Sequence, residues 1–143
     1  VTEVSEQDLS EVYHLLSLLE SDAAGVVARQ ATDAQLQDLK DLHEELEVAA
    51  QPAQLDRERF FEVNERFHMR VLDIANNRWR NQMVSDLRKV MKLNRHNSLL
   101  KSGRIDESLQ EHRAIMAALL DKDAALAIAR VQEHFRNGLT AAN

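Results

Sequence analysis

The chain has 143 residues, of which 44% are hydrophobic and 29% charged, so it can bury one core beneath a polar surface. It has no cysteine, which excludes disulfide bonds, thiolate metal sites and cysteine nucleophiles. The net charge of −6 argues against a nucleic-acid-binding surface, and no apolar run approaches the ~18 to 20 residues of a membrane span. We therefore expect one soluble, cytoplasmic domain over residues 1–143 that does not enter a membrane.

Three glycines and one proline are few for this length, whereas Leu, Ala, Glu, Gln, Arg and Lys, which favour helices, are common. Apolar residues recur with a period of about 3.6, which predicts an all-α fold: a single antiparallel bundle of about six helices joined by short loops. The predicted helices cover residues 6–30, 33–50, 56–75, 78–98, 105–120 and 124–138.

The first two predicted helices belong to an acidic part of the chain. Residues 1–62 hold 15 acidic residues against 4 basic ones, and Thr32 has the side chain and position to cap the second helix. His14 and His43 lie at the edges of the apolar stripes of these helices. We expect both histidines to be ordinary surface or boundary residues.

The third predicted helix contains "FFEVNERFHMRVLDIA", residues 60–75, with two polar residues inside its apolar stripe. Asn64 and His68 are one turn apart, and at ~100° per residue their side chains project within about 40° of each other. The pattern predicts that both point into the bundle.

The fourth predicted helix lies in the one basic segment. Residues 78–104 hold eight basic residues against the single acid Asp86, so this segment is expected to meet an anion or an acidic neighbour, with most of its charges solvated. The periodicity predicts that Trp79 and Met83 face the core. His96, near the end of this helix, is expected at the surface.

The last two predicted helices form a hairpin around "DKD", residues 121–123, and each carries a histidine on its apolar face. His112 lies about 10 residues before the centre of the turn and His134 about 12 after it. At ~1.5 Å rise per residue, antiparallel helices would place the two side chains within roughly one turn of the same level. They are therefore predicted to face each other.

Neutral imidazole is the commonest metal ligand in proteins, and three imidazoles with one amide oxygen suit a borderline divalent ion. The inward set of Asn64, His68, His112 and His134 therefore suggests one metal ion, with zinc or nickel as the leading candidates. A single buried histidine is more often hydrogen-bonded than metal-bound, so the hypothesis depends on the whole set.

Three stretches resemble a known family. They are "SEQDLSEVYHLLSLLESDAAGVVARQATDAQLQDL", "NERFHMRVLDIANN" and "EHRAIMAALLDKDAALAIARVQEHF", in the order and spacing of an FCD effector-binding domain. The FCD domain is the all-helical C-terminal half of FadR-type transcription regulators in the GntR superfamily, and the resemblance covers almost the whole chain.

The resemblance implies a sensor rather than an enzyme. In that family an Asp or Asn, a His one turn later and two histidines in the last two helices bind a divalent metal, and these positions match Asn64, His68, His112 and His134. The resemblance also implies a small organic-acid effector beside the metal and a homodimer. It implies DNA binding only through an N-terminal winged-helix domain, which this chain lacks.

Two positions depart from the family pattern. Where the first helix of the family has an arginine that holds an effector carboxylate, this chain has Leu16, so Arg88 and Arg95 become the candidate effector-binding residues. Position 64 is Asn rather than Asp; an amide is a weaker ligand and leaves one more unit of positive charge, which favours an anionic effector on the metal.

A three-histidine metal site could instead belong to a hydrolase, which would need a general base or acid near the metal. Glu65 and Glu111 are neighbours of the predicted ligands in sequence, but neither is expected to point clearly inward.

A ferritin-like di-iron site is a second alternative, because Glu-x-x-His occurs at residues 11–14 and 65–68. That reading leaves His112 and His134 unexplained. A metal-free helical dimerisation module is the remaining alternative.

Overall fold

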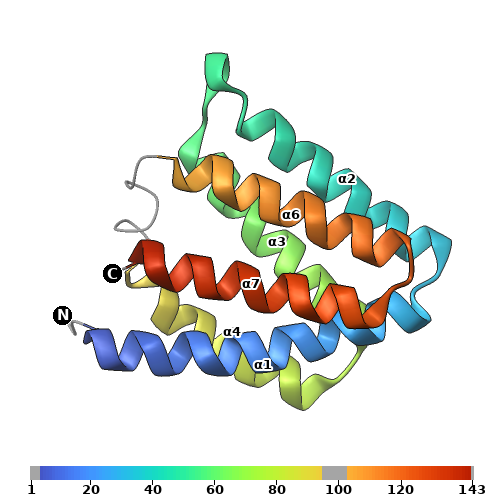
Figure 1. Ribbon diagram of the computed structural model, residues 1–143, viewed down its shortest axis with the longest axis horizontal. Coiled ribbons are helices and arrows are strands. Elements are labelled where there is room, and N and C mark those ends of the chain that lie inside the picture. Colours follow the sequence, from blue (N-terminus) through green and yellow to red (C-terminus); the bar gives the residue numbers. More distant parts are fainter. Residues whose placement is uncertain (1–3, 95–102, 143) are drawn as a thin grey trace.

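The computed structural model describes residues 4–94 and 103–142. In this part of the chain the structure is an all-α antiparallel bundle, as predicted, with six α-helices and one short 3₁₀ turn at Pro52–Gln54 (Figure 1). The helices are α1 (Glu6–Gln30), α2 (Asp33–Ala49), α3 (Arg57–Ala75), α4 (Arg78–Lys92), α6 (Arg104–Leu120) and α7 (Ala124–Ala142).

Capping hydrogen bonds and local backbone conformations set the ends of the helices. Thr32 caps α2 through a reciprocal pair of hydrogen bonds with Gln35, which confirms the predicted cap. Asn76 adopts the left-handed conformation (φ 57°) that ends α3, and the side chain of Asn77 then caps α4. Gly103 precedes α6 with φ 80°, a conformation that favours glycine.

The helices pack so that α3 runs through the middle of the bundle. It contacts α1 and α2, while α6 and α7 form the predicted hairpin, and α7 packs along α1 (Figure 1). The N-terminal end of α1 and the C-terminal end of α7 lie at the same end of the bundle. Helices α1, α3, α6 and α7 therefore surround one interior region.

The core around this region is close-packed and apolar. Leu16, Phe67, Leu72 and Leu119 are almost fully buried, and each such side chain contributes roughly 1.5–3 kcal/mol by leaving water. A second, smaller apolar cluster surrounds Phe60 between α2, α3 and α6. Residues of both clusters line the cavity that is described below.

The fourth helix corrects the sequence interpretation in two respects. It ends at Lys92 instead of 98, and residues 95–98 of the predicted helix lie outside the described residues. Trp79 and Met83, predicted to face inward, are 70% and 50% exposed. The buried face instead carries Arg80, Val84, Arg88 and Met91, because acidic partners on α1 and α3 neutralise its arginines.

Helix α7 continues to Ala142, four residues beyond the predicted end of the last helix at residue 138. Among the described residues, no helix combines the length and the apolar character needed to cross a membrane.

Candidate metal centre

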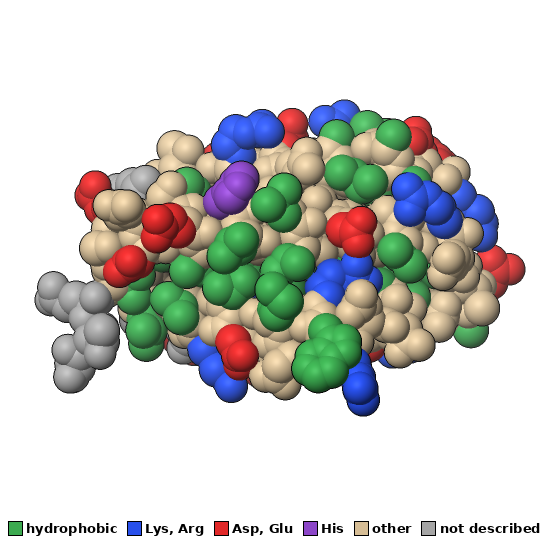
Figure 2. Space-filling view, turned by 90° about the horizontal axis from the view of Figure 1, so that it is seen from below, with side chains coloured by type: hydrophobic (Ala, Val, Ile, Leu, Met, Phe, Trp, Pro, Cys, Tyr) green, Lys and Arg blue, Asp and Glu red, His purple; other side chains and the backbone are tan. Residues whose placement is uncertain are grey.

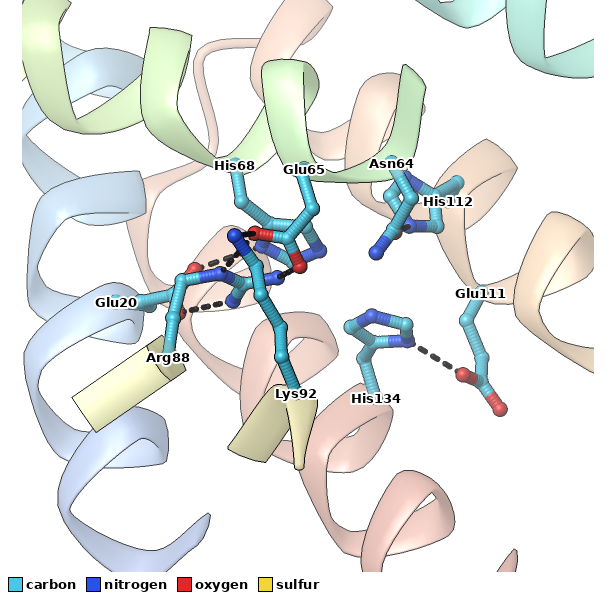
Figure 3. Close-up of polar contacts among 9 residues, drawn as sticks. All are labelled: Glu20, Asn64, Glu65, His68, Arg88, Lys92, Glu111, His112 and His134. Carbon is cyan, nitrogen blue, oxygen red and sulfur yellow. Dashed lines mark hydrogen bonds and ion pairs between the residues drawn. The ribbon is translucent and has the colours of Figure 1, made fainter. Parts of the chain in front are cut away.

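Three helices bring the four predicted ligands together. Asn64 and His68 come from α3, His112 from α6 and His134 from α7, and all point into one space (Figure 3). The three histidines are buried and Asn64 is half-buried. One nitrogen from each histidine lies within 4.8 Å of the others, a cluster that a single ion could bind with modest side-chain movement.

The donor atoms in this cluster suit a metal ion. The amide Oδ1 of Asn64 lies 2.7 Å from Nε2 of His112. Within the described part of the chain, Nε2 of His68 and Nδ1 of His112 are buried and have no hydrogen-bond partner. Leaving a buried polar group unsatisfied costs about 1–3 kcal/mol, so coordination of the His68 lone pair would remove an existing penalty.

Two buried carboxylates orient two of the histidines. Nδ1 of His68 lies 2.7 Å from Glu20, and Nδ1 of His134 lies 2.5 Å from Glu111. Each carboxylate accepts a hydrogen bond from Nδ1–H, so the Nε2 lone pair of each ring faces the shared space. This arrangement of carboxylate and histidine typically raises ligand basicity and fixes ring orientation at metal sites.

The carboxylates are themselves held by two arginines. The guanidinium of Arg88 donates to Glu20 at 2.6 Å and to Glu65 at 3.1 Å and 2.8 Å (Figure 3). Arg104 forms a bidentate pair with Glu111, with both distances 3.0 Å. These buried ion pairs lock the partners of His68 and His134 in place.

Electrostatics keeps the carboxylates charged. Burial disfavours ionisation of Glu20, but the charge of Arg88 and the contact with His68 outweigh it and lower the pKa to about 2. Burial likewise opposes ionisation of Glu111, and hydrogen bonds from His134 and Arg104 lower its pKa to about 2.

Electrostatics also favours neutral rings. Burial is the main reason that the pKa of His112 lies well below 6.5 and that the pKa of His134 falls to about 4. Neutral imidazole is the form that binds metals, so both rings are in the competent state near neutral pH.

A cavity of about 80 Å³ opens beside the histidines. Its polar lining includes Asn64, His68 and His134, together with two buried arginines, Arg88 and Arg104. The remaining wall is mostly apolar and aromatic, with Phe60, Phe61, Met91, Ile105 and Phe135. A partly enclosed apolar space with a few converging polar groups is the usual form of a small-molecule site.

The candidate effector residues have different outcomes. Arg88 reaches the cavity wall, but its guanidinium is already bonded to Glu20 and Glu65, so its contact with an effector stays a prediction. Arg95 lies outside the described residues. Sequence reasoning missed Arg104, which is buried, lines the cavity and pairs with Glu111.

One expectation about the charged residues was wrong, and another holds for only part of the basic segment. Glu111 was not expected to point inward, yet it is buried against His134. In the basic segment, Arg80, Arg88 and Arg104 are buried and ion-paired, whereas Arg78, Lys89 and Lys92 are exposed as expected. The segment also meets acidic neighbours, as expected.

The remaining histidines behave as predicted where they are described. His14 is exposed and His43 is half-buried and bonded to Glu47, while His96 lies outside the described residues. Because Glu11 is exposed together with His14, the first Glu-x-x-His motif does not form an inward di-iron half-site.

The chain is an all-helical domain of a family found in transcription regulators. The FCD domain model matches residues 11–137, and the chain belongs to this family. It is 26% identical over 137 residues to the HTH-type transcriptional regulator YdhC of Bacillus subtilis (strain 168), a match that covers 96% of this chain and 61% of that protein.

A solved structure shares the fold. E. coli McbR/YncC superposes with a TM-score of 0.88 at 22% sequence identity, covering 99% of this chain and 67% of that one. The chain therefore spans about two thirds of the length of these relatives.

Proposed function

We propose that this chain is the ligand-sensing part of a GntR-family transcription regulator that binds one divalent metal ion, zinc or nickel, through Asn64, His68, His112 and His134. The observation that carries the proposal is the buried cluster of three histidines, in which Nε2 of His68 lacks a hydrogen-bond partner among the described residues. Such a metal ion supplies a positively charged centre that a small organic acid can bind.

The cavity supports an effector beside the metal. It borders His68 and His134 and carries arginine side chains on its wall, which suits a small carboxylate. In the whole regulator, an effector would change DNA binding only if it bound one arrangement of the protein better than another. DNA binding itself would reside in an N-terminal winged helix outside this chain, and the protein would act in the cytoplasm.

A homodimer completes the proposal. Four large apolar side chains are exposed on two helices that pack together: Leu15 and Leu18 on α1, and Trp79 and Met83 on α4. Figure 2 shows hydrophobic side chains gathered on the side of the molecule seen from below Figure 1, where these helices lie. Trp and Met are enriched at protein interfaces, and a second copy of the chain is the partner we propose.

The hydrolase alternative finds less support in the site. A general base that works near neutral pH needs a pKa near the working pH. Glu20 and Glu111 have a pKa of about 2 and are each bonded to a histidine and an arginine, so they are poor bases and good positioning groups.

Metal analysis tests the proposal directly. Protein purified without a nickel column should contain about one divalent ion per chain, or take up one when zinc is supplied. His112→Ala combined with His134→Ala should abolish uptake, while His14→Ala, at an exposed position, should not. Two iron ions per chain, or no uptake by the unaltered protein, would refute the metal site.

A further inference from the structure

The cavity extends from the histidines along the α6–α7 hairpin towards the side chain of Arg104. On α6, Ser108 precedes His112 by one turn, and on α7, Gly138 follows His134 by one turn. Because the two helices are antiparallel, both steps run in the same direction, and both residues line the cavity with Arg104. The far end of the cavity therefore lies about one helical turn, roughly 5–6 Å, from the histidines.

Arg104 is suited to bind an anion at that end. Its guanidinium uses Nη1 and Nη2 to hold Glu111, and within residues 4–94 and 103–142 it has no other hydrogen-bond partner. Guanidinium carries five N–H donors in a planar fork, so the pair with Glu111 occupies only part of its capacity. Arg104 is buried and lines the cavity, so a ligand in that space could reach donors that Glu111 does not use.

Gly138 keeps this end of the cavity open. A Cβ atom at this position would lie 3.2 Å from Cε2 of Tyr13 and 3.6 Å from Nη2 of Arg104. Glycine inside a helix is less favourable than alanine, so its presence in α7 calls for a local reason. At Gly25 the reason is close packing of two helices, because a Cβ there would lie 2.9 Å from Ile128 in the contact between α1 and α7.

The charges around the site are already balanced before a metal binds. Three carboxylates, on Glu20, Glu65 and Glu111, are paired with three cations, on Arg88, Lys92 and Arg104. Asn64 adds no charge, so a divalent ion would leave two positive charges uncompensated in a partly enclosed space. Charge that is removed from water requires a counter-charge.

We propose that Arg104 and the space left by Gly138 form a second anion subsite, and that the effector is a short dianion. One acid group faces the metal and the other faces Arg104. The spacing of one helical turn fits dicarboxylates of about three to five carbons. This inference rests on the proposed metal-dependent sensing function.

A dicarboxylate series tests the inference on the zinc-loaded protein. Malonate, succinate, glutarate and adipate are compared with acetate and butyrate by calorimetric titration and thermal shift. A dicarboxylate of three to five carbons should bind at least tenfold tighter than acetate, and adipate should bind more weakly than the best of them. Equal affinities for acetate and all four dicarboxylates would overturn the inference.

Two variants locate the second subsite. Arg104→Gln and Gly138→Ala should each bring the ratio of dicarboxylate to acetate affinity close to one, the first by removing the charge and the second by filling the space. Thr140→Ala, at an exposed position on the same helix, is the control and should leave the ratio unchanged. An unchanged ratio in both test variants would exclude this subsite.

The outcomes distinguish failure of the dianion subsite from failure of the proposed metal-dependent sensor. If zinc does not bind, or if neither acetate nor any dicarboxylate binds, the metal-dependent sensor and the dianion subsite both fail. If zinc and acetate bind but dicarboxylates bind no more tightly, the sensor stands and only the dianion subsite fails.

Discussion

Glu20 lies 2.7 Å from Nδ1 of His68 although the two residues are 48 positions apart in the chain. The contact joins α1 to α3 and directs Nε2 of His68 towards the other histidines. Glu111 does the same for His134 from within the α6–α7 hairpin. Each carboxylate is also bound to an arginine, so ring orientation depends on charges spread over three helices, α1, α4 and α6.

We expect both carboxylates to set metal affinity. Glu20→Gln and Glu111→Gln should each weaken zinc binding by roughly 10- to 100-fold, because a neutral amide does not raise the basicity of the imidazole. Competition with a chelating dye measures the affinity. Glu47→Gln is the control, since Glu47 pairs with Arg113 on the surface. Unchanged zinc affinity in both test variants would show that these contacts serve folding alone.

The positions of the four candidate ligands could be predicted because each interrupts an apolar stripe. Asn64 and His68 share a face with Phe60 and Phe67, and helical spacing alone turns that face inward. A short hairpin then fixes the relative levels of His112 and His134. Local periodicity and the short hairpin were therefore enough to predict the positions of these four residues.

The charged partners could not be predicted in the same way. Arg88 is buried only because Glu20 and Glu65 lie against it, and such pairing between distant segments leaves no periodic signal. For the same reason α4 is rotated from its predicted orientation, with Trp79 outward. A weak signal existed for Glu20, which follows Leu16 by one turn on the buried face of α1.

Stability of the metal-free protein should depend on pH through His134. Its pKa is about 4 in the folded protein against an ordinary 6.5, so the unfolded chain binds this proton more tightly. The free energy of unfolding should therefore fall as pH drops from 6.5 towards 4, by about 3 kcal/mol for this residue. His112 acts in the same direction, because its pKa is also lowered.

Urea unfolding at pH 7.5, 6 and 5 measures this dependence, and His134→Gln should reduce the slope while His14→Gln should not. Loss of the stabilisation by Glu20 and Glu111 begins only below their ordinary pKa of 4.5, as they become protonated, so it lies outside this window. Equal stability at pH 7.5 and 5 would contradict the assignment of buried neutral rings.

Asn64→Asp should raise the affinity of the site for the metal and lower its affinity for an anionic effector. The amide Oδ1 already lies 2.7 Å from His112, so a carboxylate at this position could bind the metal with little movement. The added negative charge should tighten zinc binding and weaken an anionic effector, each by about tenfold or more. Titrating zinc and then succinate into both proteins gives the two affinities. If neither changes, Asn64 is not a ligand.

The proposed dimer should depend on the exposed apolar side chains of α1 and α4. Trp79 and Met83 are one turn apart on α4, and both are at least half exposed. Replacing both with serine should weaken self-association by at least 100-fold, because buried aromatic side chains commonly dominate interface energies. Sedimentation over a range of protein concentrations measures the dissociation constant.

A matched pair of substitutions controls for the loss of apolar surface in general. Val48→Ser with Leu55→Ser removes two exposed apolar side chains at α2 and just beyond it, away from α1 and α4, and should leave the dimer intact. Metal content should stay at one ion per chain in both double variants, since none of the four residues lines the histidine cavity. A protein that sediments as a monomer before any substitution, or a dimer that resists the Trp79 and Met83 changes, would assign this apolar surface to another partner.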